Sequence, residues 1–236
     1  MKSARWARWY ACSLCEQEYH GVVACALGWA CWKTYLGRPE TDEIRVNAMG
    51  LLGSGLSHTT HDEEALSVRE ALLSMLRRLG ADERSILDAQ FNLANTYEEL
   101  ERSEEALRLR RDVYSGWLKL NGEEHRSTLM AANNCAESLK NLERFEEFKS
   151  LVRKTIPVAR RVLGESHELS LRMRWNYARV LYQDDDATLD DLREAVTTLE
   201  DTERTARRVF GGAHPLTAGI EASLHNARIT LREQDA

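Results

Sequence analysis

A short marker recurs along the chain at intervals that match the length of a pair of helices. The segment 122–125 reads Gly-Glu-Glu-His, returns 42 residues later as Gly-Glu-Ser-His at 164–167, and returns after another 47 residues as Gly-Gly-Ala-His at 211–214. Self-similarity at a period of about 20 to 50 residues is typical of stacked supersecondary units. The sequence therefore predicts a repeat protein.

Each interval between markers contains two stretches with the apolar spacing of a helix. After the first marker these stretches cover residues 128–139 and 145–163. The last interval is longer by five residues, which we place in the polar loop Gln183–Ala187, since surface loops tolerate insertions. Proline is scarce and strand-like alternation is absent, so the predicted fold class is all-α.

These repeated positions resemble the tetratricopeptide repeat, in the 42-residue variety found in kinesin light chain. The small residues Ala94, Ala136 and Ala178 stand where that motif needs close contact between its helices. The resemblance implies a right-handed α-solenoid of helix-turn-helix repeats. We therefore expect an array of about four repeats and a C-terminal capping helix over residues 39–236, with the first helix of each repeat lining a concave binding surface.

The helix predicted over residues 43–56 begins after an N-cap at Thr41 or Asp42 and contains three glycines. Each glycine lowers the intrinsic stability of a helix by ~1 kcal/mol relative to alanine but permits another helix to approach closely. We expect tight helix packing at this element.

The turn histidines of the three markers are separated from one another by a full helix pair. We therefore expect them to lie along a ridge and not to converge on one metal ion. A ring nitrogen of each histidine is predicted to satisfy backbone groups at its turn.

Charge and hydropathy exclude several classes of function. The formal net charge is −6, whereas a nucleic-acid-binding protein is expected to carry a basic stripe, so no nucleic-acid partner is predicted. The longest apolar run, Val22–Trp32, is shorter than the ~18 residues that span a bilayer, so no membrane partner is predicted. Glu16 and Glu18 precede this run and disfavour a secretory signal, which predicts a cytoplasmic protein.

Residues 1–38 differ from the rest and contain many of the tryptophans and cysteines. We expect them to form a separate module or cap. Cys12, Cys15, His20 and Cys25 have the spacing C-x2-C-x4-H-x4-C, which resembles a CCHC zinc knuckle or a MYND-like finger. Three thiolates and one imidazole can complete a tetrahedral zinc shell, so Zn²⁺ is a candidate cofactor.

The same cysteines have an alternative interpretation. Cys25 and Cys31 also fit a helix over residues 21–36 that packs against the first repeat, and buried free cysteine is common and inert. Both interpretations stay open on the sequence alone.

The resemblance implies which side chains face the binding groove. Asn92, Asn134 and Asn176 recur at matched positions, and their amides can donate to and accept from an extended peptide. Aromatic side chains would supply apolar anchors, and two arginines a fork for a carboxylate. The predicted groove comprises Phe91, Asn92, Asn95, Asn133, Asn134, Arg172, Trp175, Asn176 and Arg179.

An enzyme would need a nucleophile beside a base, or paired carboxylates in a pocket. The candidate serines and turn histidines recur with the repeat and so have a structural explanation. The sequence therefore predicts a non-enzymatic scaffold that binds a peptide or protein segment in the groove. The alternative is a metal-dependent adaptor whose N-terminal zinc finger contacts a second partner.

Overall fold

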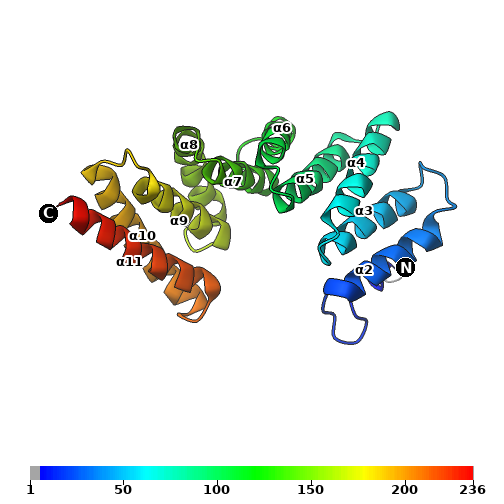
Figure 1. Ribbon diagram of the computed structural model, residues 1–236, viewed down its shortest axis with the longest axis horizontal. Coiled ribbons are helices and arrows are strands. Elements are labelled where there is room, and N and C mark those ends of the chain that lie inside the picture. The colour runs from blue at the N-terminus through cyan, green and yellow to red at the C-terminus, as the bar shows by residue number, and fades with distance from the viewer. Residues whose placement is uncertain (1–5, 236) are drawn as a thin grey trace. The chain divides into compact units, whose positions relative to one another are not determined.

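The computed structural model describes residues 6–235, and these fold into ten helices with one isolated β-bridge between Ala11 and Glu18. The predicted all-α class and the solenoid of helix pairs are confirmed (Figure 1). No helix within the described range is long and apolar enough to cross a bilayer. The helices are α2 (Gly21–Tyr35), α3 (Glu43–Ser57), α4 (Asp62–Arg78), α5 (Glu83–Glu99), α6 (Ser103–Asn121), α7 (Arg126–Asn141), α8 (Phe145–Leu163), α9 (Glu168–Gln183), α10 (Leu189–Phe210) and α11 (Pro215–Gln234).

The chain divides into two compact units, and the division falls inside α6. Unit 1 extends to Gly116 and unit 2 begins at Trp117. The predicted boundary after residue 38 lies within unit 1, where α2 packs directly on α3.

The repeated marker ends one helix and begins the next. Its glycine has a positive φ. This backbone conformation strains residues that carry a Cβ, but glycine adopts it readily. Its histidine is the N-cap of the following helix, and Nδ1 accepts a hydrogen bond from the backbone N–H two residues later. The glycines are Gly122, Gly164 and Gly211, at φ 80°, 93° and 83°. The histidine bonds are His125 with Ser127 at 3.2 Å, His167 with Leu169 at 3.1 Å and His214 with Leu216 at 3.2 Å. The structural role predicted for these histidines is confirmed.

Helices α2 and α3 touch backbone to backbone. A Cβ added at Gly55 of α3 would lie 2.8 Å from the carbonyl oxygen of Ala24, and one added at Gly28 of α2 would lie 3.1 Å from that of Leu51. Asp42 is the N-cap of α3, and its Oδ1 accepts from the backbone N–H two residues on. The tight packing predicted from the glycine-rich helix is confirmed.

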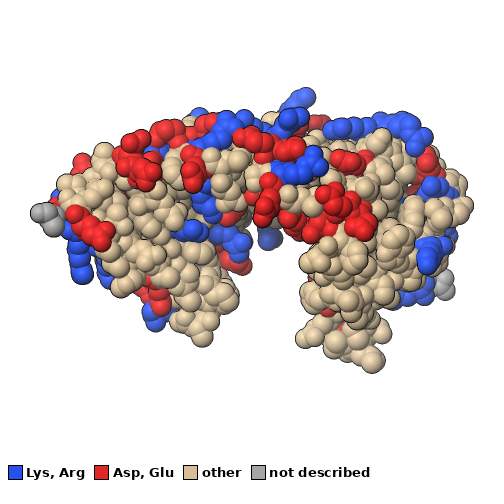
Figure 2. Space-filling model, in the orientation of Figure 1, with Lys and Arg blue, Asp and Glu red and all other residues tan. Residues whose placement is uncertain are grey.

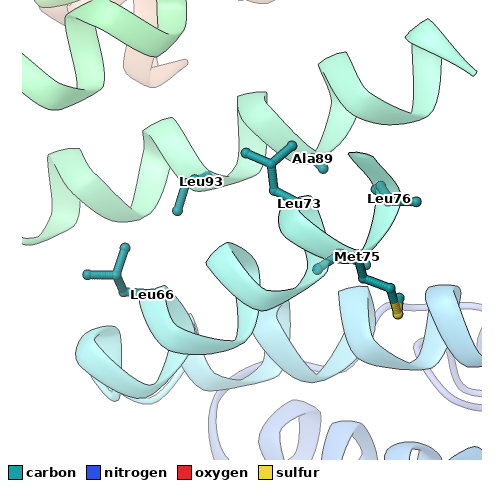
Figure 3. Close-up of a cluster of buried hydrophobic side chains, with 7 residues drawn as sticks. Leu66, Leu73, Met75, Leu76, Ala89 and Leu93 are labelled. Atoms are coloured by element: carbon teal, nitrogen blue, oxygen red, sulfur yellow. The ribbon is translucent and has the colours of Figure 1, made fainter. Parts of the chain in front are cut away.

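The core of unit 1 is a leucine-rich cluster between α4 and α5 (Figure 3). Each such side chain contributes about 1.5–3 kcal/mol when it is fully buried. The cluster consists of Leu66, Leu72, Leu73, Met75, Leu76, Ala89 and Leu93. Beside it, Arg69 is buried, and its Nη1 donates to the carbonyl oxygen of Asn92 at 3.0 Å and to the Thr96 hydroxyl.

In unit 2, α9 is the central helix. It packs against α8 and α10 and also against α7 and α11, so the first helices of successive repeats lie side by side. Ala136 and Ala178 are buried at the predicted close-contact positions. In the inserted loop, Asp184 accepts a hydrogen bond from the Lys149 ammonium at 2.9 Å, and the Thr188 capping box then starts α10.

Candidate functional site

Two adjoining hollows lie on the surface formed by α7, α9 and α11 in unit 2, which we call the α9 face. The larger hollow has a volume of about 340 Å³ and the smaller one about 200 Å³. The larger is lined by Glu137, Glu168, Arg172, Trp175, Asn176, Arg179, His214, Pro215 and Leu216. The smaller is lined by Arg126, Met130, Asn133, Asn134, His167, Glu168, Leu169 and Arg172. Six of the nine predicted groove residues therefore lie on this face.

An ion pair separates the two hollows. The Arg172 guanidinium lies 2.6 Å from Glu168 one turn earlier on α9, and both residues line both hollows. Arg172 is therefore already paired with a carboxylate of its own helix. In the described part of the chain, Arg126 and Arg179 form no such ion pair, so they are the cations of this face with unused donors.

Trp175 is held by α11. Its indole Nε1 donates to the Ser223 hydroxyl at 2.8 Å, and a Cβ added at Gly219 would lie 2.7 Å from the ring. The Arg179 guanidinium lies 5.7 Å from the ring centroid, within range of a cation–π contact. The predicted apolar anchor is thus half-buried, with its polar atom satisfied within the chain.

The predicted asparagine ladder is partly used within the protein. Asn176 is only 5% exposed, and its amide donates to Glu137 Oε2 at 3.2 Å. The other oxygen of Glu137 accepts from the Lys140 ammonium at 2.6 Å. Glu137 therefore fixes the orientation of Asn176. Asn133 is also buried, and its amide lies 3.5 Å from the side-chain oxygen of the half-buried Asn134.

The three remaining groove residues lie on α5, in unit 1. Asn92 is exposed, whereas Phe91 and Asn95 are half-buried. The Asn95 side-chain oxygen accepts from Arg110 at 3.5 Å, a long hydrogen bond. These residues belong to the matching first helix of an earlier repeat.

The four predicted zinc ligands take different roles in the structure. Cys12 and Cys15 lie together in a turn, but Cys25 packs against the apolar cluster of α3 and α4, and the His20 ring contacts the His58 ring edge to face at 5.7 Å. Within residues 6–235, no group of three or more histidine, cysteine or acidic side chains is arranged to hold a metal ion. Of the four predicted zinc ligands, only Cys12 and Cys15 lie close together in the structure.

The cysteines differ in acidity for physical reasons. Hydrogen bonds from the backbone N–H groups of Cys15 and Leu14, and from the Cys15 thiol, lower the pKa of Cys12. Burial raises the pKa of Cys31 to about 11. Cys12 is therefore the thiol disposed to ionise, and Cys31 has the packing role that the alternative interpretation gave it.

Several lining residues were absent from the predicted groove. Arg126, Glu168, Leu169 and Leu216 enter the hollows because they stand in the first turns of α7, α9 and α11. These residues could have been predicted from the repeat marker. Its histidine is the N-cap of the next helix, so the first turns of α7, α9 and α11 occupy equivalent positions in successive repeats.

Comparisons with known proteins give one sequence-level match and several structural ones. The tetratricopeptide repeat family matches residues 87–127 and 128–168. No curated protein matches the sequence. Among solved structures, BtubC (BKLC) from P. vanneervenii is 16% identical with a TM-score of 0.62, covering 90% of this chain and 91% of that one. A Podosopora anserina putative kinesin light chain with nearly identical TPR-like repeats is 20% identical with a TM-score of 0.68, covering 84% and 90%. A Rap protein complexed with Competence and Sporulation Factor is 16% identical with a TM-score of 0.59, covering 90% and 60%.

The stacked helix pairs and the repeated turns define a helical-repeat protein. Within that class, residues 87–168 match the tetratricopeptide repeat, and this match falls on α5–α8 and their turns. The likeness to the kinesin light chain structure is one of fold.

Proposed function

We propose that the protein is a non-enzymatic scaffold that binds an extended segment of a protein partner across the α9 face. The observation that carries the proposal is the pair of adjoining hollows on three neighbouring first helices. Tetratricopeptide repeats are protein-interaction scaffolds as a class, and the fold supports that role here.

The spacing of the hollows suits an extended chain. Packed helices lie about 8–10 Å apart, and a chain extended in the polyproline II conformation rises about 3.1 Å per residue with about three residues per turn, so that every third side chain lies on the same face. Side chains about three residues apart in the partner would therefore reach the two hollows. A helical ligand rises only about 1.5 Å per residue and would need roughly six residues to cover the same distance.

The chemistry of the lining favours acidic side chains in the partner. Glu137 is bonded to Asn176 and Lys140, and Glu168 is paired with Arg172, so both carboxylates are neutralised within the chain. Arg126 and Arg179 retain their donors, and guanidinium groups bind carboxylates with two parallel hydrogen bonds. An aspartate or glutamate side chain of the partner in each hollow would accept hydrogen bonds from these guanidinium groups.

The proposal is tested by selecting peptides from a phage-displayed random library against the full chain. We expect acidic residues to be enriched about three positions apart. The double variant Arg126→Ala, Arg179→Ala should bind the selected peptides at least about a hundredfold more weakly, since each of the two lost charge-assisted hydrogen bonds contributes about 1.5 kcal/mol or more.

A matched control removes two arginines elsewhere in unit 2. Arg204 and Arg208 are exposed on α10, outside the α9 face, so the double variant Arg204→Ala, Arg208→Ala should bind as wild type does. Equal affinity of all three proteins would place the binding surface elsewhere and refute the proposal.

The metal-dependent adaptor is the second candidate, and it requires Cys25 to leave its contacts with α3 and α4. Its support is the closeness of Cys12 and Cys15, which form a Cys-x-x-Cys pair suited to zinc. Elemental analysis of protein purified without an affinity metal tests it. About one equivalent of zinc would favour the adaptor, and less than about half an equivalent would retire it.

A further inference from the structure

The outward side of α2 carries a band of exposed apolar side chains. Val22, Val23 and Trp29 are 75%, 47% and 43% exposed, and the alanines between them, Ala26 and Ala30, are exposed as well. At 3.6 residues per turn these five positions form one stripe, with Ala26 at its centre both along the helix and around it. Figure 2 shows the end of unit 1 that carries α2 as largely tan.

The opposite side of α2 is already packed. Gly28 and Cys31 are buried, and the backbone of α2 touches that of α3. Inside a solenoid each helix is covered on two sides, and a helix that is apolar all round is normally buried all round. In the described range, α3 covers one side of α2 and Trp6 and Trp9 pack against Tyr35 near its end, whereas the apolar stripe stays exposed.

We propose that α2 pairs with α2 of a second copy of this chain, antiparallel about a two-fold axis that passes near Ala26. In that arrangement Trp29 of each copy lies against Val23 of the other, and Ala30 lies against Val22. The small Ala26 side chains meet at the axis, where they let the two backbones approach closely. The stripe is thus complementary to itself, which an interface between identical surfaces requires.

The charges at the ends of α2 select a second copy and the antiparallel direction. Glu16 and Glu18 lie exposed just before the helix, and Lys33 lies exposed in its last turn. An antiparallel pair brings Lys33 of one copy towards the acidic end of the other at both ends of the interface. A parallel pair would place Lys33 against Lys33, which is unfavourable. Opposed helix dipoles also favour the antiparallel arrangement.

Sedimentation equilibrium of the full chain tests the proposal. We expect a concentration-dependent monomer–dimer equilibrium. Ala26→Arg would place two cations at the axis and should leave only monomer, whereas Ala71→Arg, at an exposed alanine on α4 of the same unit, should dimerise as wild type does. Both positions are exposed, so neither substitution should change the circular dichroism spectrum.

A charge exchange tests the direction of pairing. Lys33→Glu should weaken the dimer about two- to thirtyfold, because it removes an exposed ion pair at each end of the interface and each such pair contributes about 0.2–1 kcal/mol. Adding Glu18→Lys to that variant should restore the wild-type dissociation constant. A wild-type protein that stays monomeric up to about 0.5 mM, or a dimer that Ala26→Arg leaves intact, would overturn the proposal.

Discussion

At each repeat turn an imidazole nitrogen takes the place of the carboxylate or hydroxyl oxygen that usually caps a helix. Because Nδ1 accepts a hydrogen bond, the proton of the neutral ring is assigned to Nε2. Each histidine thus satisfies a backbone N–H that would otherwise be unpaired at the start of α7, α9 or α11. These single bonds fix where the helices of the α9 face begin.

Replacing one of these caps should lower stability. His167→Ala removes the acceptor for the Leu169 N–H, and we expect the free energy of unfolding to fall by about 1 kcal/mol. His167→Asn keeps a side-chain acceptor at the N-cap and should recover most of that loss. Chemical denaturation of the three proteins measures the difference. Equal losses for both variants would mean that the ring's packing, and not its hydrogen bond, stabilises the turn.

The thiols should react in the order of their acidity. Because its pKa is lowered, Cys12 should be alkylated by iodoacetamide with a pH midpoint below that of an unperturbed cysteine. Cys31, whose pKa is raised to about 11 by burial, should stay unmodified in the folded protein. Mass spectrometry of the modified peptides over a pH series resolves each residue. Rapid modification of Cys31 would contradict its burial.

At the scale of single elements, glycine positions decide how closely α2 and α3 approach. Gly55 faces the backbone of α2, whereas a Cβ added at Gly50, on the same helix, would have its nearest neighbour at 3.9 Å. Both glycines lie on α3, but only Gly55 is in close contact with another backbone. Alanine substitutions at the two positions therefore separate the effect of this contact from the effect of helix propensity.

Gly55→Ala should destabilise the protein and Gly50→Ala should not. The new methyl at position 55 would press on the Ala24 carbonyl, and overpacking of this kind costs about 1–3 kcal/mol. At position 50 the methyl has room, and the gain in helix propensity should stabilise the protein by up to about 1 kcal/mol. Thermal unfolding compares them, and equal melting temperatures would refute the backbone contact between α2 and α3.

The elements also show how far the sequence could predict the structure. Helix positions and turn roles followed from the marker, because its glycine and histidine act through local backbone bonds. The contacts of Trp175 with Ser223 and of Asn176 with Glu137 did not follow, because each joins side chains of different repeats through rotamers that periodicity does not encode. The zinc spacing was compatible with a finger, but Cys25 falls on the face of α2 that packs against the first repeat.

At the scale of the whole chain, each helix is stabilised mainly by its neighbours in sequence. In unit 2, α11 packs against both α9 and α10. It is the last helix in the described part of the chain. In a linear array of this kind the stability is a sum of local terms, and the loss of an end helix affects the adjacent repeat most.

Removing α11 should therefore damage unit 2 selectively. Without it, the apolar side of α10, with Leu192, Val196 and Leu199, loses cover, and we expect lower solubility and a lower melting temperature. Hydrogen exchange should rise in α9 and α10 while α4 and α5 keep their protection. Truncation after Arg232 leaves most of α11 in place and is the control. An unchanged melting temperature on removal of the whole helix would contradict the capping role.

A partner segment bound across α7, α9 and α11 would shield the backbone of these three helices. Hydrogen exchange of the full chain, measured with and without a library-selected peptide at saturation, tests it most directly. We expect added protection in the first turns of α7, α9 and α11 and in the segment 172–179, with none in α2. Protection confined to α2, or to α8 and α10 alone, would contradict it.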